Sequence, residues 1–152
     1  MSFFGVQLMF AYSPISFQAV EANRETLLAV LTKLNITDVI IRYEGGGDSG
    51  DVAEVTVMPE SLMPQLALEQ MTHRHVVTGY SDNQYHYHIE ERLLSVNEAL
   101  HDFALEWVDV HHSGWENNDG GSGTVTIQVA NNRFQLEHTE YYTESCGYEY
   151  TL

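Results

Sequence analysis

The chain contains many short stretches of strand character but only two long stretches of helical periodicity, and this order restricts the fold class most strongly. An apolar repeat of two residues indicates a half-buried strand, whereas a repeat of 3.6 residues indicates a helix. Helices do not alternate with strands, as a parallel βαβ fold requires. The sequence therefore predicts an α+β fold with a largely antiparallel sheet and two main helices, at about residues 14–34 and 96–112. The predicted strands are residues 3–12, 38–43, 52–58, 72–78, 84–89, 124–129 and 133–138.

Local signals mark where some of these elements begin and turn. Pro14 indicates the start of the first helix, since Pro fits the first helical turn. Ser95 and Glu98 have the spacing of a capping box, in which the Ser side chain accepts a hydrogen bond from the amide three residues later. Between the last two strands, Asn131 and Asn132 suit a type I′ turn because Asn tolerates positive φ.

Charge limits the classes of partner. The chain of 152 residues has 22 acidic residues against 6 Lys and Arg, so its net charge is −16. Such a chain repels nucleic acid and anionic membranes and favours basic protein surfaces and cations. We expect one acidic domain over residues 1–152, located in the cytoplasm, because no apolar run has the roughly 20 residues of a membrane helix and no basic segment precedes the apolar N-terminal stretch. The sequence is compatible with a monomer or a homodimer.

Two glycine-rich loops, at residues 45–50 and 114–123, carry acidic side chains. Carboxylates on such loops can supply oxygen ligands to a divalent cation, because glycine lets the chain turn tightly around an ion. If the two loops meet, the sequence predicts a metal site there. The alternative is that both loops are turns without a ligand. The residues of this candidate site are Asp48, Asp51, His112, Glu116 and Asp119.

Two His-x-His pairs provide a second candidate metal site, formed by His73, His75, His86 and His88. Residues two apart on a strand share a face. If strands 72–78 and 84–89 pair through a loop with an even number of residues, all four imidazoles lie on one face. That arrangement favours binding of a transition metal. A loop with an odd number of residues would place the two pairs on opposite faces.

Acidic and tyrosine side chains interleave in the last third of the chain. Spaced carboxylates can imitate the phosphates of a nucleic acid, and tyrosine provides contact area at low entropic cost. This pattern favours a binding surface for a basic partner; the alternative is an ordinary solvated face. The residues of this candidate surface are Glu137, Glu140, Tyr141, Tyr142, Glu144, Tyr148, Glu149 and Tyr150.

The strings YEGGGDSG at residues 43–50 and HSGWENNDG at residues 112–120 resemble a bacterial domain family without an assigned activity, found on plasmids, phages and other mobile elements. The resemblance covers about residues 20–58 and 95–150, and the string YTES at residues 142–145 fits it as well. It implies a mobile-element setting, in which small acidic proteins act against host defence.

Catalytic signatures are incomplete, which favours a binding protein over an enzyme. Cys146 has no neighbouring base, and no phosphate-binding loop or nucleophile elbow is present. The sequence therefore favours an acidic inhibitor, such as an anti-CRISPR or other anti-defence factor, that imitates nucleic acid and binds the basic surface of a host nucleic-acid-binding protein. The alternatives are a small metal-dependent enzyme or metal-binding domain that uses the two glycine-rich loops, and an accessory protein without a site.

Overall fold

The computed structural model describes the backbone of residues 3–152 and the side chains from residue 14 onward. Within these residues the chain forms three α-helices, one short 3-10 helix and six strands. The α+β class predicted from the sequence is therefore confirmed. In chain order the elements are α1 (Phe3–Lys33), β1 (Asp38–Gly46), β2 (Ser49–Met58), η1 (Glu60–Leu62), α2 (Gln65–Leu68), β3 (Gln70–Ser81), β4 (Gln84–Ser95), α3 (Val96–His111), β5 (Gly121–Gln128) and β6 (Arg133–Glu140).

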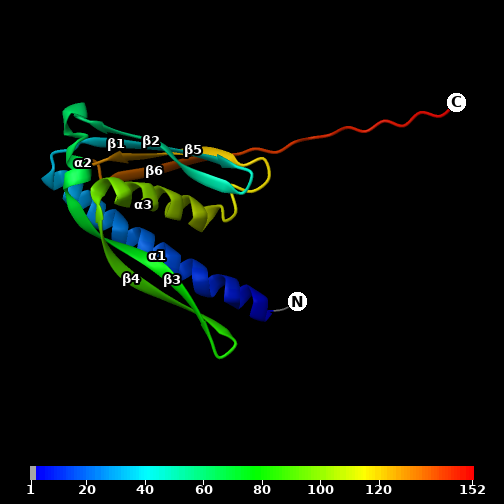
Figure 1. The fold of residues 1–152 in the computed structure, drawn as a ribbon, viewed down its shortest axis with the longest axis horizontal. Coiled ribbons are helices and arrows are strands. Elements are labelled where there is room, and N and C mark those ends of the chain that lie inside the picture. Colours follow the sequence, from blue (N-terminus) through cyan, green and yellow to red (C-terminus); the bar gives the residue numbers. More distant parts are fainter. Residues whose placement is uncertain (1–2) are drawn as a thin grey trace.

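The six strands form two antiparallel sheets instead of one. The first sheet has the order β2-β1-β5-β6, and the second is the hairpin β3–β4. Helices α1 and α3 lie between the two, with the four-stranded sheet on one side and the long hairpin on the other (Figure 1). Helix α1 is followed by the hairpin β1–β2 of the larger sheet. Helix α3 is followed, after a loop, by the hairpin β5–β6 of the same sheet.

The main core fills the space between the larger sheet and the two long helices. Leu27 and Leu31 of α1 meet Phe103 of α3, and all three are almost completely buried. Val39 and Ile127 supply the sheet side of the same cluster. No helix among the described residues has both the length and the hydrophobicity needed to cross a bilayer.

The first helix begins much earlier than predicted. Residues 3–12, predicted as a strand, belong to α1, and Pro14 lies inside this helix instead of in its first turn. In residues 3–12 only Gly5 and Gln7 fall outside the apolar class. A nearly continuous apolar run fits both a period of two and a period of 3.6, so hydrophobicity alone could not separate strand from helix.

The start of α3 was predicted well. Ser95 is its N-cap, and the Ser95 side chain accepts a hydrogen bond of 3.1 Å from the backbone amide of Glu98. The β5–β6 turn differs from the prediction, because only Asn132 has a positive φ, of 49°. A type I′ turn needs positive φ at both central residues. The chain instead turns over residues 129–132, so that β5 ends at Gln128, one residue before the predicted bound, and β6 begins at Arg133, as predicted.

The β3–β4 turn is shorter than predicted and sets the face on which the histidines lie. Its two residues, Asp82 and Asn83, have φ values of 52° and 60°, which is the pattern of a type I′ turn. Strand β3 continues through residues 79–81, beyond its predicted end, and the two strands extend to Gln70 and Ser95 at the other end of the hairpin. Because the loop has an even number of residues, the structure fulfils the same-face condition for the two His-x-His pairs.

Candidate metal centre

The two glycine-rich loops meet, but through their backbones. The amide of Gly47 donates to the carbonyl of Asn118 at 3.3 Å, and the amide of Asp48 donates to the carbonyl of Glu116 at 3.1 Å. Gly47 and Asp48 have φ values of 62° and 71°, so the β1–β2 loop is a type I′ turn. Trp115 covers this turn so closely that a Cβ on Gly50 would lie 2.5 Å from the indole.

The carboxylates of these loops do not converge on one point. Asp51 accepts a hydrogen bond from the amide of Val52 at 2.7 Å, and Asp119 accepts one from the hydroxyl of Thr143 at 2.7 Å. Within the described side chains, no group of three metal-ligating residues includes Asp48, Asp51, Glu116 or Asp119. Of the five residues predicted here, His112 alone joins such a group, with two residues of β6.

All four histidines of the second prediction lie on one face of the hairpin, but they separate along its length. In the β3–β4 register, His75 pairs with Glu90 and His88 pairs with Val77, which places one His pair nearer the tip than the other. His86 and His88 are exposed there, whereas His73 is fully buried and His75 is largely covered. The structure therefore gathers two of the four imidazoles against the helices.

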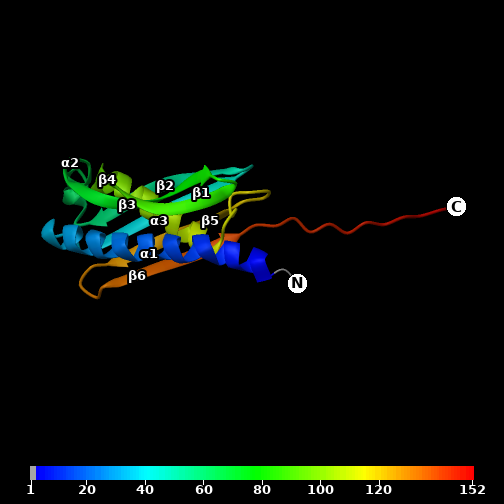
Figure 2. The same ribbon diagram turned by 90° about the horizontal axis from the view of Figure 1, so that it is seen from below.

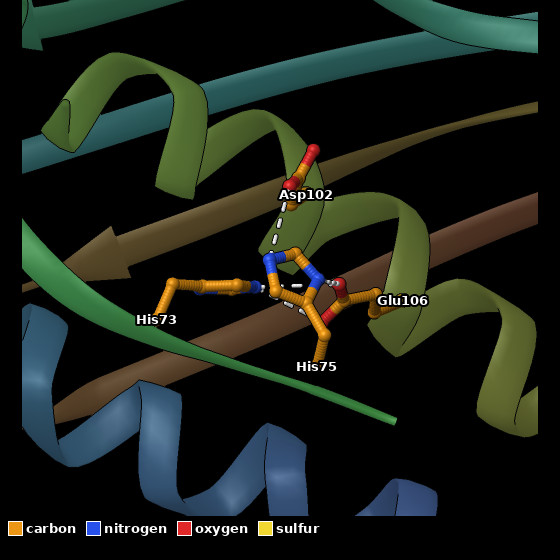
Figure 3. A group of neighbouring side chains, drawn as sticks. All are labelled: His73, His75, Asp102 and Glu106. Carbon is orange, nitrogen blue, oxygen red and sulfur yellow. Dashed lines mark hydrogen bonds and ion pairs between the residues drawn. The ribbon is translucent and has the colours of Figure 1, made fainter. Parts of the chain in front are cut away.

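The buried pair faces two carboxylates of α3, as Figure 3 shows. Asp102 and Glu106 are four residues apart, so they share one side of the helix. Nε2 of His73 lies 3.2 Å from Oε2 of Glu106, and Nδ1 of His75 lies 3.2 Å from Oε1 of the same carboxylate. Nε2 of His75 lies 3.9 Å from Oδ2 of Asp102. One potential ligand atom from each of the four residues lies within 4.8 Å of all the others.

Helix α1 holds the β3 side of this cluster in place. The side chain of Asn23, which is fully buried, donates to the carbonyl of Arg74 at 2.9 Å and accepts from its amide at 2.8 Å. Arg74 separates the two histidines in the chain, so these bonds fix the backbone between them. The amide nitrogen of Asn23 also lies 3.4 Å from Nε2 of His73. An edge strand is thereby anchored to a helix at the point where its side chains meet α3.

The cluster contains more negative charge and more nitrogen lone pairs than its own contacts satisfy. Burial raises the pKa of Asp102, and the Glu106 carboxylate raises it further, while the nearby histidines oppose the shift. Nδ1 of His73 and Nε2 of His75 are buried without a hydrogen-bond partner. Buried polar atoms are ordinarily paired. A cation among these atoms would offset the repulsion between the two carboxylates and bind imidazole nitrogen.

Sequence reasoning missed Asp102, Glu106 and Asn23. A signal for the first two was present: an acidic pair at a spacing of four residues on the best-marked helix presents two carboxylates on one side. Their meeting with the His-x-His pair depends on how the hairpin packs on α3, which local patterns do not reveal. Asn23 gave no signal, because a polar residue in a helix is ordinarily exposed.

The acidic and tyrosine surface predicted near the C-terminus lies at the end of β6 and on the segment that follows it. Residues 141–152 form no helix or strand and extend away from the rest of the molecule (Figures 1 and 2). The tyrosines and glutamates of this segment are exposed. Near its start, the amide of Tyr141 donates to the carbonyl of Gly120 at 2.9 Å, which ties the segment to the second glycine-rich loop.

Substitutions at Asp48 test whether this residue stabilises the turn or binds a metal ion. Asp48→Ala should lower the free energy of unfolding by about 1 kcal/mol, because a Cβ-bearing residue without a local polar group is strained at positive φ. Asp48→Asn should keep the stability, since Asn tolerates this conformation. Urea denaturation measures both. A loss of metal-induced stabilisation in Asp48→Asn would instead identify the carboxylate as a ligand.

Asp109 should make stability depend on pH. Burial and the Glu116 carboxylate raise its pKa in the folded state, although a backbone hydrogen bond from Gly114 opposes them. Its contribution to stability is therefore present below the usual aspartate pKa of about 3.9 and is lost as pH rises through the folded value. As pH rises through the folded-state pKa, the Asp109→Asn variant should become more stable than the natural chain. Urea denaturation at several pH values measures the difference in the free energy of unfolding. The exposed Glu144→Gln variant serves as the control, and a pH-independent difference for Asp109→Asn would contradict the assignment.

Comparison with known proteins identifies the family. Residues 19–152 match the model of a family of unknown function, DUF6878. The match includes residues 59–94, which the resemblance noted in the sequence did not cover, and therefore the hairpin that carries His73 and His75. No curated protein and no solved structure matches the chain. Because the family model spans most of its length, the chain belongs to this family of unknown function.

Proposed function

We propose that this protein binds a divalent transition-metal ion through His73, His75, Asp102 and Glu106. The observation that carries the proposal is the fully buried His73 side chain. Its Nε2 atom faces Glu106 at 3.2 Å and belongs to a group in which one ligand atom from each of four residues lies within 4.8 Å of the others. Two imidazoles and two carboxylates from β3 and α3 converge around this side chain.

The spacing of the ligand atoms fits a small ion after minor adjustment. Bonds of about 2.1 Å in a tetrahedral centre place ligand atoms roughly 3.4 Å apart. Nε2 of His73 and Nδ1 of His75 each lie 3.2 Å from an oxygen of Glu106, close to this separation. Asp102 faces the other ring nitrogen of His75, Nε2, at 3.9 Å, so its side chain must rotate to join an ion held at Nδ1.

The mixed nitrogen and oxygen ligands favour Zn²⁺ and neighbouring first-row ions over Ca²⁺ and Mg²⁺, which prefer oxygen ligands alone. The two histidines form the buried side of the cluster, while the side chains of Asp102 and Glu106 are 42% and 32% exposed. An ion would therefore enter past the carboxylates, and a further ligand, such as water, would bind on this solvent side. That arrangement serves metal binding directly and also provides the starting point for metal-assisted chemistry.

Titration with metal ions tests the proposal. Zn²⁺ or Co²⁺ should stabilise the protein by about 2.7 kcal/mol at a free concentration one hundred times the dissociation constant. Asp102→Asn and Glu106→Gln should each weaken binding by at least about tenfold, as even changes next to metal ligands do. Calorimetric titration measures affinity, and the absorption spectrum of bound Co²⁺ reports imidazole and carboxylate ligands.

Asp109→Asn is the matched control for these variants, because it removes an acidic residue from the same helix without touching the cluster. It should leave the affinity unchanged. Equal losses of affinity in all three variants would show a general effect of charge and contradict the site. An absence of any metal-induced stabilisation in the natural chain would contradict it as well.

A second candidate function is the acidic binding module expected from the sequence, an inhibitor from a mobile element that engages the basic surface of a host nucleic-acid-binding protein. The exposed C-terminal segment supports this candidate, because it presents Tyr148 and Tyr150 beside Glu144 and Glu149 with few contacts to the folded body. Exposed tyrosines beside acidic groups suit recognition of a basic partner. The metal site is better supported, because it depends on converging side chains instead of on charge and exposure.

Affinity capture from a bacterial lysate tests this second candidate. A partner bound through charge should leave the immobilised protein as the salt concentration rises, because salt screens such contacts. Glu144→Gln combined with Glu149→Gln should reduce its recovery at low salt, whereas Glu21→Gln on helix α1 should not. A partner that is retained at high salt, or recovered equally with both variants, would contradict an electrostatic decoy.

A further inference from the structure

A second group of metal-ligating side chains lies at the C-terminal end of α3. His112 is the C-cap of this helix, and His138 and Glu140 are two residues apart on β6, so they share one face of the strand. Nδ1 of His112 and Nε2 of His138 each lie 3.4 Å from the same oxygen, Oε1 of Glu140. The ligand atoms of all three residues lie within 4.8 Å of one another.

The ring of His138 is held firmly in this group. Its side chain is 4% exposed, and its Nδ1 atom lies 2.6 Å from the hydroxyl of Tyr43, which is itself buried. The imidazole of His112 stacks on it with ring centroids 4.4 Å apart, and Trp115 meets it edge-on at 6.0 Å. Contacts on several sides therefore fix the direction of Nε2.

That nitrogen points into the group without a hydrogen-bond partner. Nε2 of His138 is buried and, although close to Glu140, does not meet it in hydrogen-bond geometry. His112 and Glu140 are partly exposed, so the group opens to solvent on their side. A buried, oriented and unpaired imidazole nitrogen facing a second imidazole and a carboxylate is the arrangement that a divalent transition metal binds.

We propose that His112, His138 and Glu140 form a second binding site for a divalent transition metal, with solvent supplying the remaining ligands. The site uses none of the residues of the His73 cluster, so it stands or fails independently of the function proposed above. Its ligand types suit Zn²⁺, Co²⁺, Ni²⁺ and Cu²⁺.

Tyr43 would act as a positioning residue for this site. Metal binding at Nε2 requires the proton of His138 to sit on Nδ1, from which it can be donated to the Tyr43 oxygen. Hydrogen bonds of this kind to the second ring nitrogen orient metal-binding histidines.

An ion at this position would connect the end of α3 to the end of β6. Both lie beside the second glycine-rich loop, whose Gly120 carbonyl accepts the amide of Tyr141 at the start of the C-terminal segment. Metal binding would thus fix the point from which this segment leaves the body. The same loop contacts the β1–β2 turn, so the ion would stabilise the meeting of the two loops.

The test uses the full chain carrying Asp102→Asn and Glu106→Gln, so that the first cluster cannot bind. Calorimetric titration of this variant with Zn²⁺ should still show one bound ion per chain. Adding His112→Ala should weaken that binding by at least about tenfold. His111→Ala is the matched control, because its exposed imidazole neighbours the site without belonging to it.

Three further results test the proposal. Tyr43→Phe should weaken Zn²⁺ binding by about tenfold or more while the ion count stays at one per chain. No bound Zn²⁺ in the variant that lacks the first cluster would overturn the proposal. An equal loss of affinity in His111→Ala and His112→Ala would overturn it too, since the binding would then arise from surface histidines in general.

Discussion

Helix α3 is covered on two sides by chemically different surfaces, and the rest of the structure depends on this packing. Phe103 and the neighbouring apolar side chains are buried against the larger sheet, whereas Asp102 and Glu106 point toward the hairpin β3–β4. Partial removal of two carboxylates from water is unfavourable unless positive or proton-donating groups meet them. The histidines of β3 contact both carboxylates, so polar contacts as well as apolar packing join the hairpin to α3.

The elements that the sequence predicted correctly are those whose signals are local. The N-cap Ser95 marks α3 through a hydrogen bond to a residue only three positions away. Burial alternates along β1 and β6 because the helices cover one face of the larger sheet and not the other. Residues 3–12 carry no such distinction, since they are apolar almost throughout. In that segment the choice between strand and helix depended on context that the local pattern does not contain.

The site residues show the same division between local and distant information. The placement of His73 and His75 on one face follows from their spacing, and the relation to His86 and His88 depends only on the length of one turn. The turn proved to be even-numbered because Asp82 and Asn83 both adopt positive φ. Which pair becomes buried depends instead on contacts with α1 and α3, distant in the chain. The same contacts place the carboxylates of α3 beside His73 and His75.

Negative charge alone does not distinguish the candidate functions, because a net charge of −16 favours both cations and basic proteins. The positions of individual atoms do. Both clusters combine carboxylate oxygen with buried imidazole nitrogen that has no hydrogen-bond partner. A decoy for a basic protein needs accessible carboxylates but has no use for buried imidazoles. The burial of two imidazoles in a strongly acidic chain, those of His73 and His138, therefore favours the proposed metal sites over the proposed decoy.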